Sequence, residues 1–223
     1  MKQETRIALG KSDPGNYRPV SLTSVPCKVL ESIIKDDVTA YLEKKSFYNN
    51  CQHGFVKGRS TLTYLLETLE SWTRLLEEGF GIDVIYLDYR KAFDTVPHKR
   101  LLEKIKGLGL SRNLLAWIGI FLQDRRMKVR VRGSCSEWIM VTSGVPQGSV
   151  LGPLLFLIFV QDLPDWIKNS IMMFGDDTKI WTAIANGDDA ESLQQDLNRL
   201  GDWSDKWLLK FNPAKCKSNA HWT

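Results

Sequence analysis

Three aspartates in this sequence stand where carboxylates could act together. Asp176 and Asp177 are adjacent in the stretch MFGDDTKI, between apolar, strand-like segments, and Asp88 ends the apolar run 82–88. Crowded carboxylates repel one another unless their pKa values rise or a cation neutralises them. Mg²⁺ prefers oxygen ligands, and a pair of such ions stabilises both the attacking and the leaving oxygen of a phosphoryl displacement. The three acids therefore suit nucleotidyl transfer.

A simpler interpretation of the same acids stays open at this point. Taken singly, an aspartate in such a position is typical of a turn or of a helix cap. The metal interpretation also requires the strand that ends in Asp88 to pair with the hairpin that carries Asp176 and Asp177. Spacing alone does not decide between the two interpretations.

The elements that would position the acids follow from periodicity and turn residues. Helical patterns cover residues 24–43, 61–78, 98–106 and 112–123, and a last helix is expected to begin with Asp188 or Asp189 as its cap. Strands are expected at 82–88, 127–131, 138–141, 171–174 and 178–183, whereas residues 1–16 show no regular pattern. Regular strand–helix–strand alternation is missing. This favours an α+β domain with helices on one face of a small antiparallel sheet.

Composition limits the class of protein. The chain has 223 residues, 43% hydrophobic and 25% charged, which is enough for one sizeable core, and its net charge of +4 is compatible with a polyanionic partner. Its four cysteines lack CxxC spacing, so we expect reduced thiols in an intracellular compartment rather than a zinc cluster or a disulfide framework. The N-terminus lacks an apolar signal core, and the longest apolar run, 154–160, is too short to span a bilayer.

Six blocks of the sequence share their order with the blocks of a known enzyme family. They are NYRPVSLTS, QHGFVKGRST, DYRKAFDTV, SGVPQGSVLGPLLF, MFGDDTKI and LLKFNPAKCK. Together they resemble the reverse transcriptases of non-LTR (LINE-type) retrotransposons, in particular the chicken-repeat and jockey-like groups. The resemblance runs from about Lys11 to Lys217. It implies RNA-directed DNA polymerase activity on the palm of a right-hand polymerase, whose small antiparallel sheet is backed by helices, with partial fingers.

The resemblance also implies a division of the chain. Incomplete fingers are expected at 1–80 and a palm at 81–223, with a β-hairpin on the fingers side at about 126–142, all within a single reverse transcriptase domain. The helical thumb that follows the palm in this family has no counterpart here, and no endonuclease precedes the fingers. We therefore expect a fragment of a longer element protein.

Catalytic roles follow from the matching positions. Asp88, Asp176 and Asp177 correspond to the family's catalytic carboxylates, which hold two Mg²⁺ ions, with Mn²⁺ as a substitute. The backbone carbonyl of Tyr89 would complete the shell of one ion. Lys215, in NPAKC, corresponds to the lysine proposed to protonate the pyrophosphate leaving group.

Substrate-binding roles follow in the same way. Phe93 corresponds to the aromatic residue that crowds a ribose 2′-hydroxyl and so selects dNTPs. Gln147 and Gly148 match the loop that contacts the incoming nucleotide and the template, and Lys11 and Arg18 match the fingers cations that hold the triphosphate. Without the resemblance, Phe93 would be interpreted as a core aromatic, the loop as a Gly/Pro turn and the cations as solvated surface charges.

Further basic residues suit nucleic-acid contacts. Lys57 and Arg59 are expected to contact template or phosphate, although a solvated surface charge fits Lys57 equally well. In MKVRVRG, Lys128, Arg130 and Arg132 alternate with apolar residues, so one face of this strand carries three cations. Such a face neutralises phosphates without reading sequence. The expected partners are an RNA template, a DNA primer and dNTP, without a membrane.

Alternative functions remain because the sequence departs from the family pattern. Gly175 stands where the family usually has alanine, and Gln161 where it commonly has asparagine. One alternative is a catalytically inactive retrotransposon remnant that keeps the fold and weak nucleic-acid binding. Another is a viral-type RNA-dependent RNA polymerase, whose signature is also GDD. Phe93 and the stretch VPQG, however, favour a reverse transcriptase.

Overall fold

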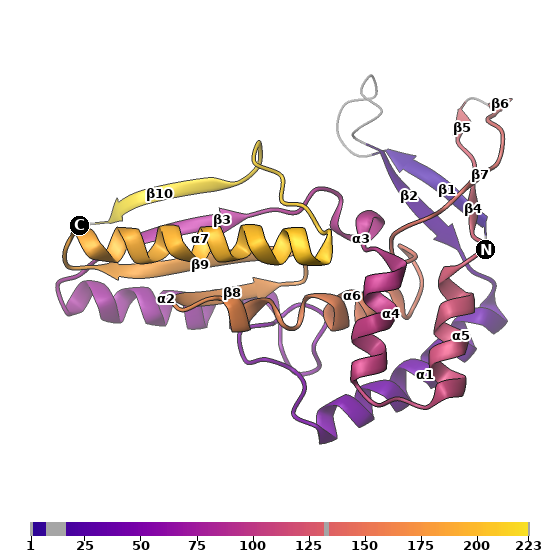
Figure 1. Cartoon of the computed structure of the whole chain (residues 1–223), viewed down its shortest axis with the longest axis horizontal. Coiled ribbons are helices and arrows are strands. Elements are labelled where there is room, and N and C mark those ends of the chain that lie inside the picture. Colours follow the sequence, from indigo (N-terminus) through magenta and orange to yellow (C-terminus); the bar gives the residue numbers. More distant parts are fainter. Residues whose placement is uncertain (1, 8–16, 132–133, 223) are drawn as a thin grey trace. The chain divides into compact units, whose positions relative to one another are not determined.

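The computed structural model of the chain describes residues 2–7, 17–131 and 134–222. Two of the predicted site residues, Lys11 and Arg132, lie outside these ranges. The chain forms two compact units, one of Met1–Leu42 with Phe93–Phe159 and one of Glu43–Ala92 with Val160–Thr223. Its course can be followed in Figure 1. The boundaries differ from the division near residue 80, because each unit joins segments that are distant in sequence; the assignment of fingers and palm stays a prediction.

The second unit is built on a four-stranded antiparallel sheet in the order β10–β3–β9–β8. Its elements are α2 (Thr61–Glu77), β3 (Gly81–Leu87), η2 (Leu163–Trp166, a 3₁₀ helix), β8 (Ser170–Phe174), β9 (Asp177–Ile184), α7 (Gly187–Trp207) and β10 (Lys217–Trp222). The small antiparallel sheet of an α+β fold is thus confirmed. β10 was not predicted from the sequence.

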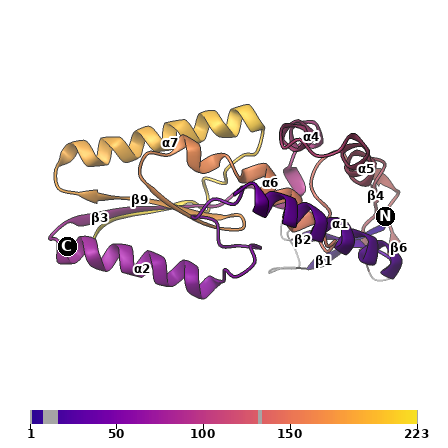
Figure 2. The same ribbon diagram turned by 90° about the horizontal axis from the view of Figure 1, so that it is seen from below.

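Helices cover both faces of this sheet, and the expectation of helices on one face only was wrong. Figure 2 shows α7 on one side of β3 and β9 and α2 on the other. The reason is that large apolar residues lie on both sides of the sheet. Trp181 of β9 packs edge-on against Trp72 of α2, whereas Tyr89, just after β3, packs against Trp203 of α7.

Capping residues determine where the two long helices of this unit begin. The Ser60 hydroxyl accepts a hydrogen bond from the Thr63 amide and caps α2. α7 begins earlier than predicted, because Asn186 is its cap and Asp189 reaches back to the Asn186 amide at 3.0 Å. This reciprocal pair is a capping box. Asp189 is therefore the third residue of the helix rather than its cap.

The first unit contains a sheet in the order β2–β1–β4–β7 and a short hairpin of β5 with β6. Its elements are β1 (Lys2–Ile7), β2 (Tyr17–Leu22), α1 (Val25–Lys44, which ends in the second unit), α3 (Ala92–Thr95), α4 (His98–Gly107), α5 (Arg112–Leu122), β4 (Arg126–Met127), β5 (Arg130–Val131), β6 (Ser134–Cys135), β7 (Ile139–Met140) and α6 (Gly152–Val160). The strands at residues 2–7 and 17–22 were not predicted. None of the helices in the described ranges is long and apolar enough to cross a membrane.

A buried carboxylate ties α1 to the loop that precedes α6. Glu31 is fully buried and accepts hydrogen bonds from the amides of Val150 and Leu151 at 2.8 and 3.1 Å. These amides stand at the start of a helix, where N–H groups lack intrahelical partners and a negative charge is favourable. Glu31 therefore holds the end of the SGVPQGSVLGP loop in place.

Candidate active site

The pairing of β3 with β9 brings two of the predicted acids face to face. Its last pair is Leu87 with Thr178, so one more step in the same register sets Asp88 opposite Asp177. Directly opposed residues of an antiparallel pair have Cβ atoms about 4.5–5.5 Å apart. Asp176 precedes Asp177 in the turn between β8 and β9. The two facing carboxylates therefore come from neighbouring strand ends.

Gly175 suits the turn that holds these acids. Phe174 pairs with Asp177, which leaves Gly175 and Asp176 as the turn residues. Gly175 has a φ of 65°, in the left-handed region that other residues adopt only with strain. A glycine at the first turn position is typical of a type II′ hairpin. The glycine that replaces the family's alanine thus fits its backbone conformation.

A cavity of about 570 Å³ opens beside the facing acids. Asp88, Asp177 and Lys215 line it together with Tyr64 of α2 and Tyr86 of β3. The Lys215 ammonium lies 3.0 Å from Asp88 Oδ2. All five residues belong to the second unit, and they combine two acids, a cation and two phenol rings in one hollow.

The donor set suits a hard cation. Within the described ranges, no three Asp, Glu, His or Cys side chains stand close enough to hold a metal ion by themselves. Mg²⁺ often takes only one or two carboxylates and completes its shell with water and substrate phosphates. Two facing carboxylates match that requirement, and in this structure the ammonium of Lys215 occupies one of them.

The backbone at Tyr89 offers a further oxygen. The Arg90 amide bonds to the Lys210 carbonyl and the Asn212 amide to the Asp88 carbonyl, each at 2.8 Å. In an antiparallel bridge of this kind, the intervening residue, Tyr89, directs its own carbonyl to the opposite side of the strand. The Tyr89 carbonyl therefore points away from the segment that carries Lys210 and Asn212.

Two ionisable side chains close to the acids were not expected from the sequence. Burial, followed by the charge of Asp177, raises the pKa of the Tyr64 hydroxyl to about 12, so this hydroxyl remains a hydrogen-bond donor at neutral pH. Lys179 lies on β9 two residues beyond Asp177, is 3% exposed, and burial lowers its pKa to about 8. Its Nζ sits 3.9 Å from the centre of the Tyr64 ring and 5.4 Å from that of Trp72.

Replacing Lys179 with methionine is expected to raise stability near pH 7 and to lose this advantage near pH 10. The folded pKa of about 8 lies below the ordinary lysine value of 10.5, so between them the unfolded chain binds more protons and the parent gains stability as pH rises. A pKa shift of this size means that the charged Lys179 destabilises the folded chain by on the order of 3 kcal/mol at neutral pH. The contacts of its ammonium with the Tyr64 and Trp72 rings offset part of this cost. Urea unfolding of both proteins at the two pH values measures the difference. A difference that stays constant with pH would contradict the burial of a charged Lys179.

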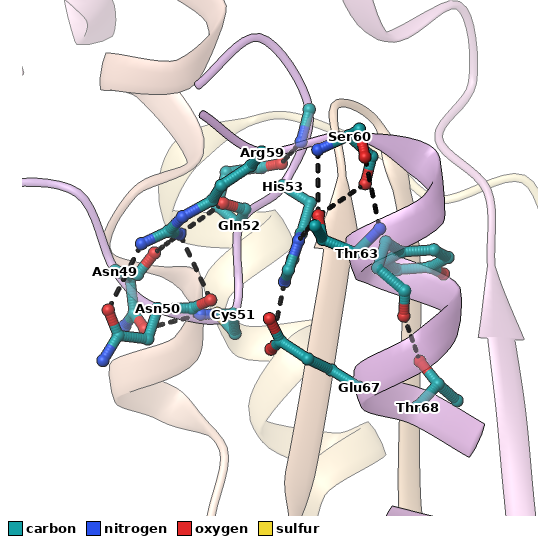
Figure 3. A network of polar contacts seen from close by, with 12 residues as sticks. Asn49, Asn50, Cys51, Gln52, His53, Arg59, Ser60, Thr63, Glu67 and Thr68 are labelled. Atoms are coloured by element: carbon teal, nitrogen blue, oxygen red, sulfur yellow. Dashed lines mark hydrogen bonds and ion pairs between the residues drawn. The ribbon is translucent and has the colours of Figure 1, made fainter. Parts of the chain in front are cut away.

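Arg59, a predicted nucleic-acid contact, is engaged within its own loop (Figure 3). Its guanidinium donates to the carbonyls of Asn49 at 2.6 Å and Asn50 at 3.2 Å, and also to that of Gln52. These bonds give Arg59 a structural role in the loop, and its contact with template stays a prediction. Lys57 is exposed.

The loop that matches the nucleotide-contacting block is held from two sides. Gln147 Nε2 donates to Asp94 Oδ1 at 2.8 Å, and the Gln147 carbonyl accepts from the Ser21 amide at 2.7 Å. Gly148 has a φ of 89°, and a Cβ there would lie 3.2 Å from the Ser21 carbonyl oxygen. The hydrogen bonds of Gln147 and the lack of room for a side chain at Gly148 therefore hold the backbone of this loop in one conformation. Asp94 is a partner that the sequence did not reveal, although it directly follows Phe93 in a matched block.

The remaining predicted residues of the first unit lie on other elements. Phe93 is half-buried and stacks on Phe156, with ring centres 4.5 Å apart and planes 17° apart. Arg18 is exposed on β2 and Arg130 on β5. Lys128 Nζ lies 4.9 Å from the centre of the Trp138 ring.

The predicted site residues thus divide between the two units. The second unit contains Asp88, Tyr89, Asp176, Asp177, Lys215, Lys57 and Arg59, and the first contains Arg18, Phe93, Gln147, Gly148, Lys128 and Arg130. Sequence reasoning missed Tyr64, Tyr86, Lys179 and Gln52. Strand alternation could have found Tyr86, because it shares a strand face with Asp88. The positions of Tyr64, Lys179 and Gln52 near the acids depend on which elements pack together, and local sequence patterns do not predict that packing.

Comparison with known proteins shows which family this sequence matches. The model of the reverse transcriptase (RNA-dependent DNA polymerase) family matches residues 9–221. The chain is 32% identical over 214 residues to a probable RNA-directed DNA polymerase from transposon BS of Drosophila melanogaster, covering 92% of this chain and 24% of that protein. It is 34% identical over 224 residues to the RNA-directed DNA polymerase from mobile element jockey of Drosophila funebris, covering 92% and 23%. The chain therefore spans about a quarter of the length of these relatives.

Solved structures share the fold. Apo telomerase from Candida tropicalis matches with a TM-score of 0.70 at 13% identity, covering 98% of this chain and 44% of that one. Telomerase from Candida albicans in complex with a TWJ fragment of telomeric RNA matches with a TM-score of 0.69 at 14% identity, covering 100% and 42%. Identities this low show the fold alone, which is the palm-like α+β fold of a polymerase.

The relatives also confirm the resemblance seen in the six sequence blocks. Transposon BS and jockey are mobile elements whose proteins are named RNA-directed DNA polymerases, as the predicted non-LTR relationship requires. They do not support a viral RNA polymerase. The family match covers nearly the whole chain and includes Asp88, Asp176 and Asp177. The chain belongs to the reverse transcriptase family of RNA-dependent DNA polymerases.

Proposed function

We propose that this chain carries the RNA-directed DNA polymerase site of a non-LTR retrotransposon protein. The observation that carries the proposal is the cavity that Asp88, Asp177 and Lys215 line together at the end of the β3–β9 pairing. The substrates would be an RNA template, a DNA primer and dNTP. In the reaction, the primer 3′-oxygen bonds to the α-phosphorus, the bond from that phosphorus to the β-phosphate oxygen breaks, and pyrophosphate leaves.

The acids would hold the ions that this chemistry needs. Asp88, Asp176, Asp177 and the Tyr89 carbonyl are the oxygens available for two Mg²⁺ ions, with Mn²⁺ as a substitute. When bound, such a pair stabilises the attacking and the leaving oxygens. Without cations, opposed carboxylates repel each other. The Lys215 ammonium beside Asp88 relieves part of that repulsion in the resting site.

Lys215 would also serve the leaving group. Its side chain is 60% exposed and is anchored through the ion pair with Asp88, so it can turn from that carboxylate toward an entering phosphate. Its Nζ would give a proton to the departing pyrophosphate oxygen, which makes pyrophosphate a better leaving group. The proton of the primer hydroxyl would pass to solvent.

Residues of the first unit would select and hold the substrates. Arg18, with Lys11, would bind the triphosphate, and Gln147 with Gly148 would contact the incoming nucleotide and the template. Asp94 supports this role, because its hydrogen bond restricts the Gln147 side chain. The cations Lys57, Arg59, Lys128, Arg130 and Arg132 would neutralise backbone phosphates, which makes binding depend on salt.

Replacing Phe93 with alanine is expected to relax the choice between dNTPs and rNTPs. The proposed role of the ring is to fill the space of a ribose 2′-hydroxyl, so its loss should lower the dTTP-to-UTP preference at least about 10-fold. Single-nucleotide incorporation kinetics with both nucleotides measure the ratio. Phe93→Tyr is the matched control, because it keeps the bulk of the ring and should keep the preference. If Phe93→Ala lowers both efficiencies equally, the ring only packs on Phe156.

A primer-extension assay tests the proposed function. The chain is expected to incorporate dTTP on poly(rA)/oligo(dT) with Mg²⁺ or Mn²⁺, and to stop when EDTA removes the ions. Asp176→Asn should abolish incorporation, because an uncharged amide is a poor ligand for a hard cation. Lack of extension by the parent with either ion would overturn the proposal. Salt-sensitive RNA binding that persists in that case would favour the inactive remnant.

A further inference from the structure

A short segment before α2 extends the sheet at the hairpin that carries the acids. The Met173 amide donates to the Cys51 carbonyl at 2.7 Å, and the His53 amide donates to the Met173 carbonyl at 2.8 Å. These bonds form a parallel bridge between Gln52 and Met173, on the free edge of β8. The segment Cys51–His53 therefore acts as an additional short strand. It pairs with β8 at Met173, two residues before the acid turn begins at Gly175.

The Gln52 side chain reaches from this segment into the turn itself. It is 2% exposed, and its Oε1 accepts hydrogen bonds from the amides of Gly54 at 2.8 Å and Gly175 at 2.9 Å. Its Nε2 also faces the Gly175 carbonyl oxygen at 3.4 Å. One side-chain amide thus engages both backbone groups of the residue that directly precedes Asp176.

The two glycines allow this close approach. A Cβ on Gly54 would lie 2.1 Å from the Gly175 nitrogen and 2.8 Å from the Phe174 carbonyl carbon. A Cβ on Gly175 would lie 3.0 Å from the Phe55 ring. Backbone therefore packs directly on backbone here, and the turn has little room to shift.

The segment that carries Gln52 is itself anchored. Figure 3 shows the Arg59 guanidinium against the carbonyls of Asn49, Asn50 and Gln52, and the Asn49 side chain against the Cys51 amide. His53 Nδ1 lies 2.9 Å from the Thr63 hydroxyl at the start of α2. Gln52 thus projects from a loop held at both ends, which is the condition for a side chain to position something else.

We propose that Gln52 is a positioning residue, which fixes the Gly175 turn so that Asp176 and Asp177 keep the geometry needed to bind the ions. The inference rests on the proposed function. The Gln52 side chain is buried and bonds to backbone, so it would act through the Gly175 backbone. Partners that orient metal ligands in this way usually matter, because small displacements of the reacting groups cost large factors in rate.

Gln52→Met tests the proposal, since methionine is similar in size and removes all three polar contacts. We expect faster hydrogen exchange at the Gly175 amide, and a roughly 10-fold or larger fall in both kcat and Mn²⁺ affinity. The KM for primer–template should stay within about twofold, because the Gln52 side chain is buried. Hydrogen exchange by mass spectrometry, Mn²⁺ titration followed by electron paramagnetic resonance, and primer extension supply the readouts.

Gln161→Met is the matched control. Gln161 lies in the same unit, and its Nε2 donates to the Phe47 carbonyl rather than to the acid turn. Removing that hydrogen bond should lower the melting temperature by a similar amount without changing Gly175 exchange or Mn²⁺ affinity. Gln52→Asn serves if the methionine variant fails to fold, because its shorter amide withdraws from Gly175 and should show the same losses.

The outcomes separate the two proposals. Parent-like Gly175 exchange and Mn²⁺ affinity in the folded Gln52 variants would overturn the role of Gln52. The same losses in Gln161→Met would also overturn it, because the effect would then be general destabilisation. Lack of extension by the parent would overturn the polymerase function instead, and the exchange and Mn²⁺ measurements would still decide what Gln52 does.

Discussion

Replacing Asp177 with asparagine is expected to lower primer extension at least about 1,000-fold. Asp177 faces Asp88 across the end of the β3–β9 pairing and lines the same cavity. Asparagine keeps the shape of the side chain but removes the charge that a hard cation requires. Asp88→Asn should have an effect of similar size, because it is the other facing carboxylate. Initial rates of dTTP incorporation measure both.

Stability measurements distinguish lost ion binding from lost folding. Without divalent ions, Asp177→Asn should be at least as stable as the parent, because the opposed carboxylate on Asp88 no longer meets a like charge. Added Mn²⁺ should raise the melting temperature of the parent through binding to the folded state, and should do so much less in the variant. Asp202→Asn, an exposed substitution on α7, should match the parent in every measurement. Full extension by Asp177→Asn would contradict the site.

Replacing Gly54 with alanine is expected to damage both stability and activity. The new Cβ would lie 2.1 Å from the Gly175 nitrogen, where only backbone could give way. Relieving such a clash in a packed region costs about 1–3 kcal/mol, or roughly 2–12 °C in melting temperature for a chain of this size. The acid turn must then move away from the Gln52 segment, so extension should fall at least about 10-fold even where the variant is folded.

A second glycine provides the control for this prediction. Gly201 is exposed within α7 and belongs to the same unit, and a Cβ added there would point into open space. Gly201→Ala should therefore stabilise the chain by about 1 kcal/mol through helix propensity and leave extension unchanged. Thermal unfolding and primer extension compare the pair. A Gly54→Ala protein with the parent's melting temperature and rate would show that the turn accommodates the methyl group.

Local signals predicted most of the elements that carry the acids. The apolar run before Asp88, the glycine between Phe174 and Asp176, and the cap at Ser60 each specify backbone conformation within a few residues. The structure contains the corresponding strand, hairpin and helix at nearly the expected bounds. Family resemblance then identified the fold, because the order of six blocks constrains which strands belong together.

Elements that depend on a distant partner were missed. β1 and β10 have weak patterns of their own, and each exists through pairing, β1 with β2 and β4 and β10 with β3. The presence of helices on both faces of the sheet was missed for a similar reason. A strand pattern shows that a face is buried, but it does not show which helix buries it.

The sequence by itself determined the strand acid, the acid turn and the family, because these depend on residue type and order. Only the tertiary structure decided that Gln52 engages Gly175, which is 123 positions away, and that Asp94 holds Gln147. It also showed that Arg59, whose contact with phosphate stays a prediction, anchors its own loop. The physical reason is that a polar side chain can bond to any backbone group within reach. Which group is within reach is decided by the packing of segments that local sequence does not relate.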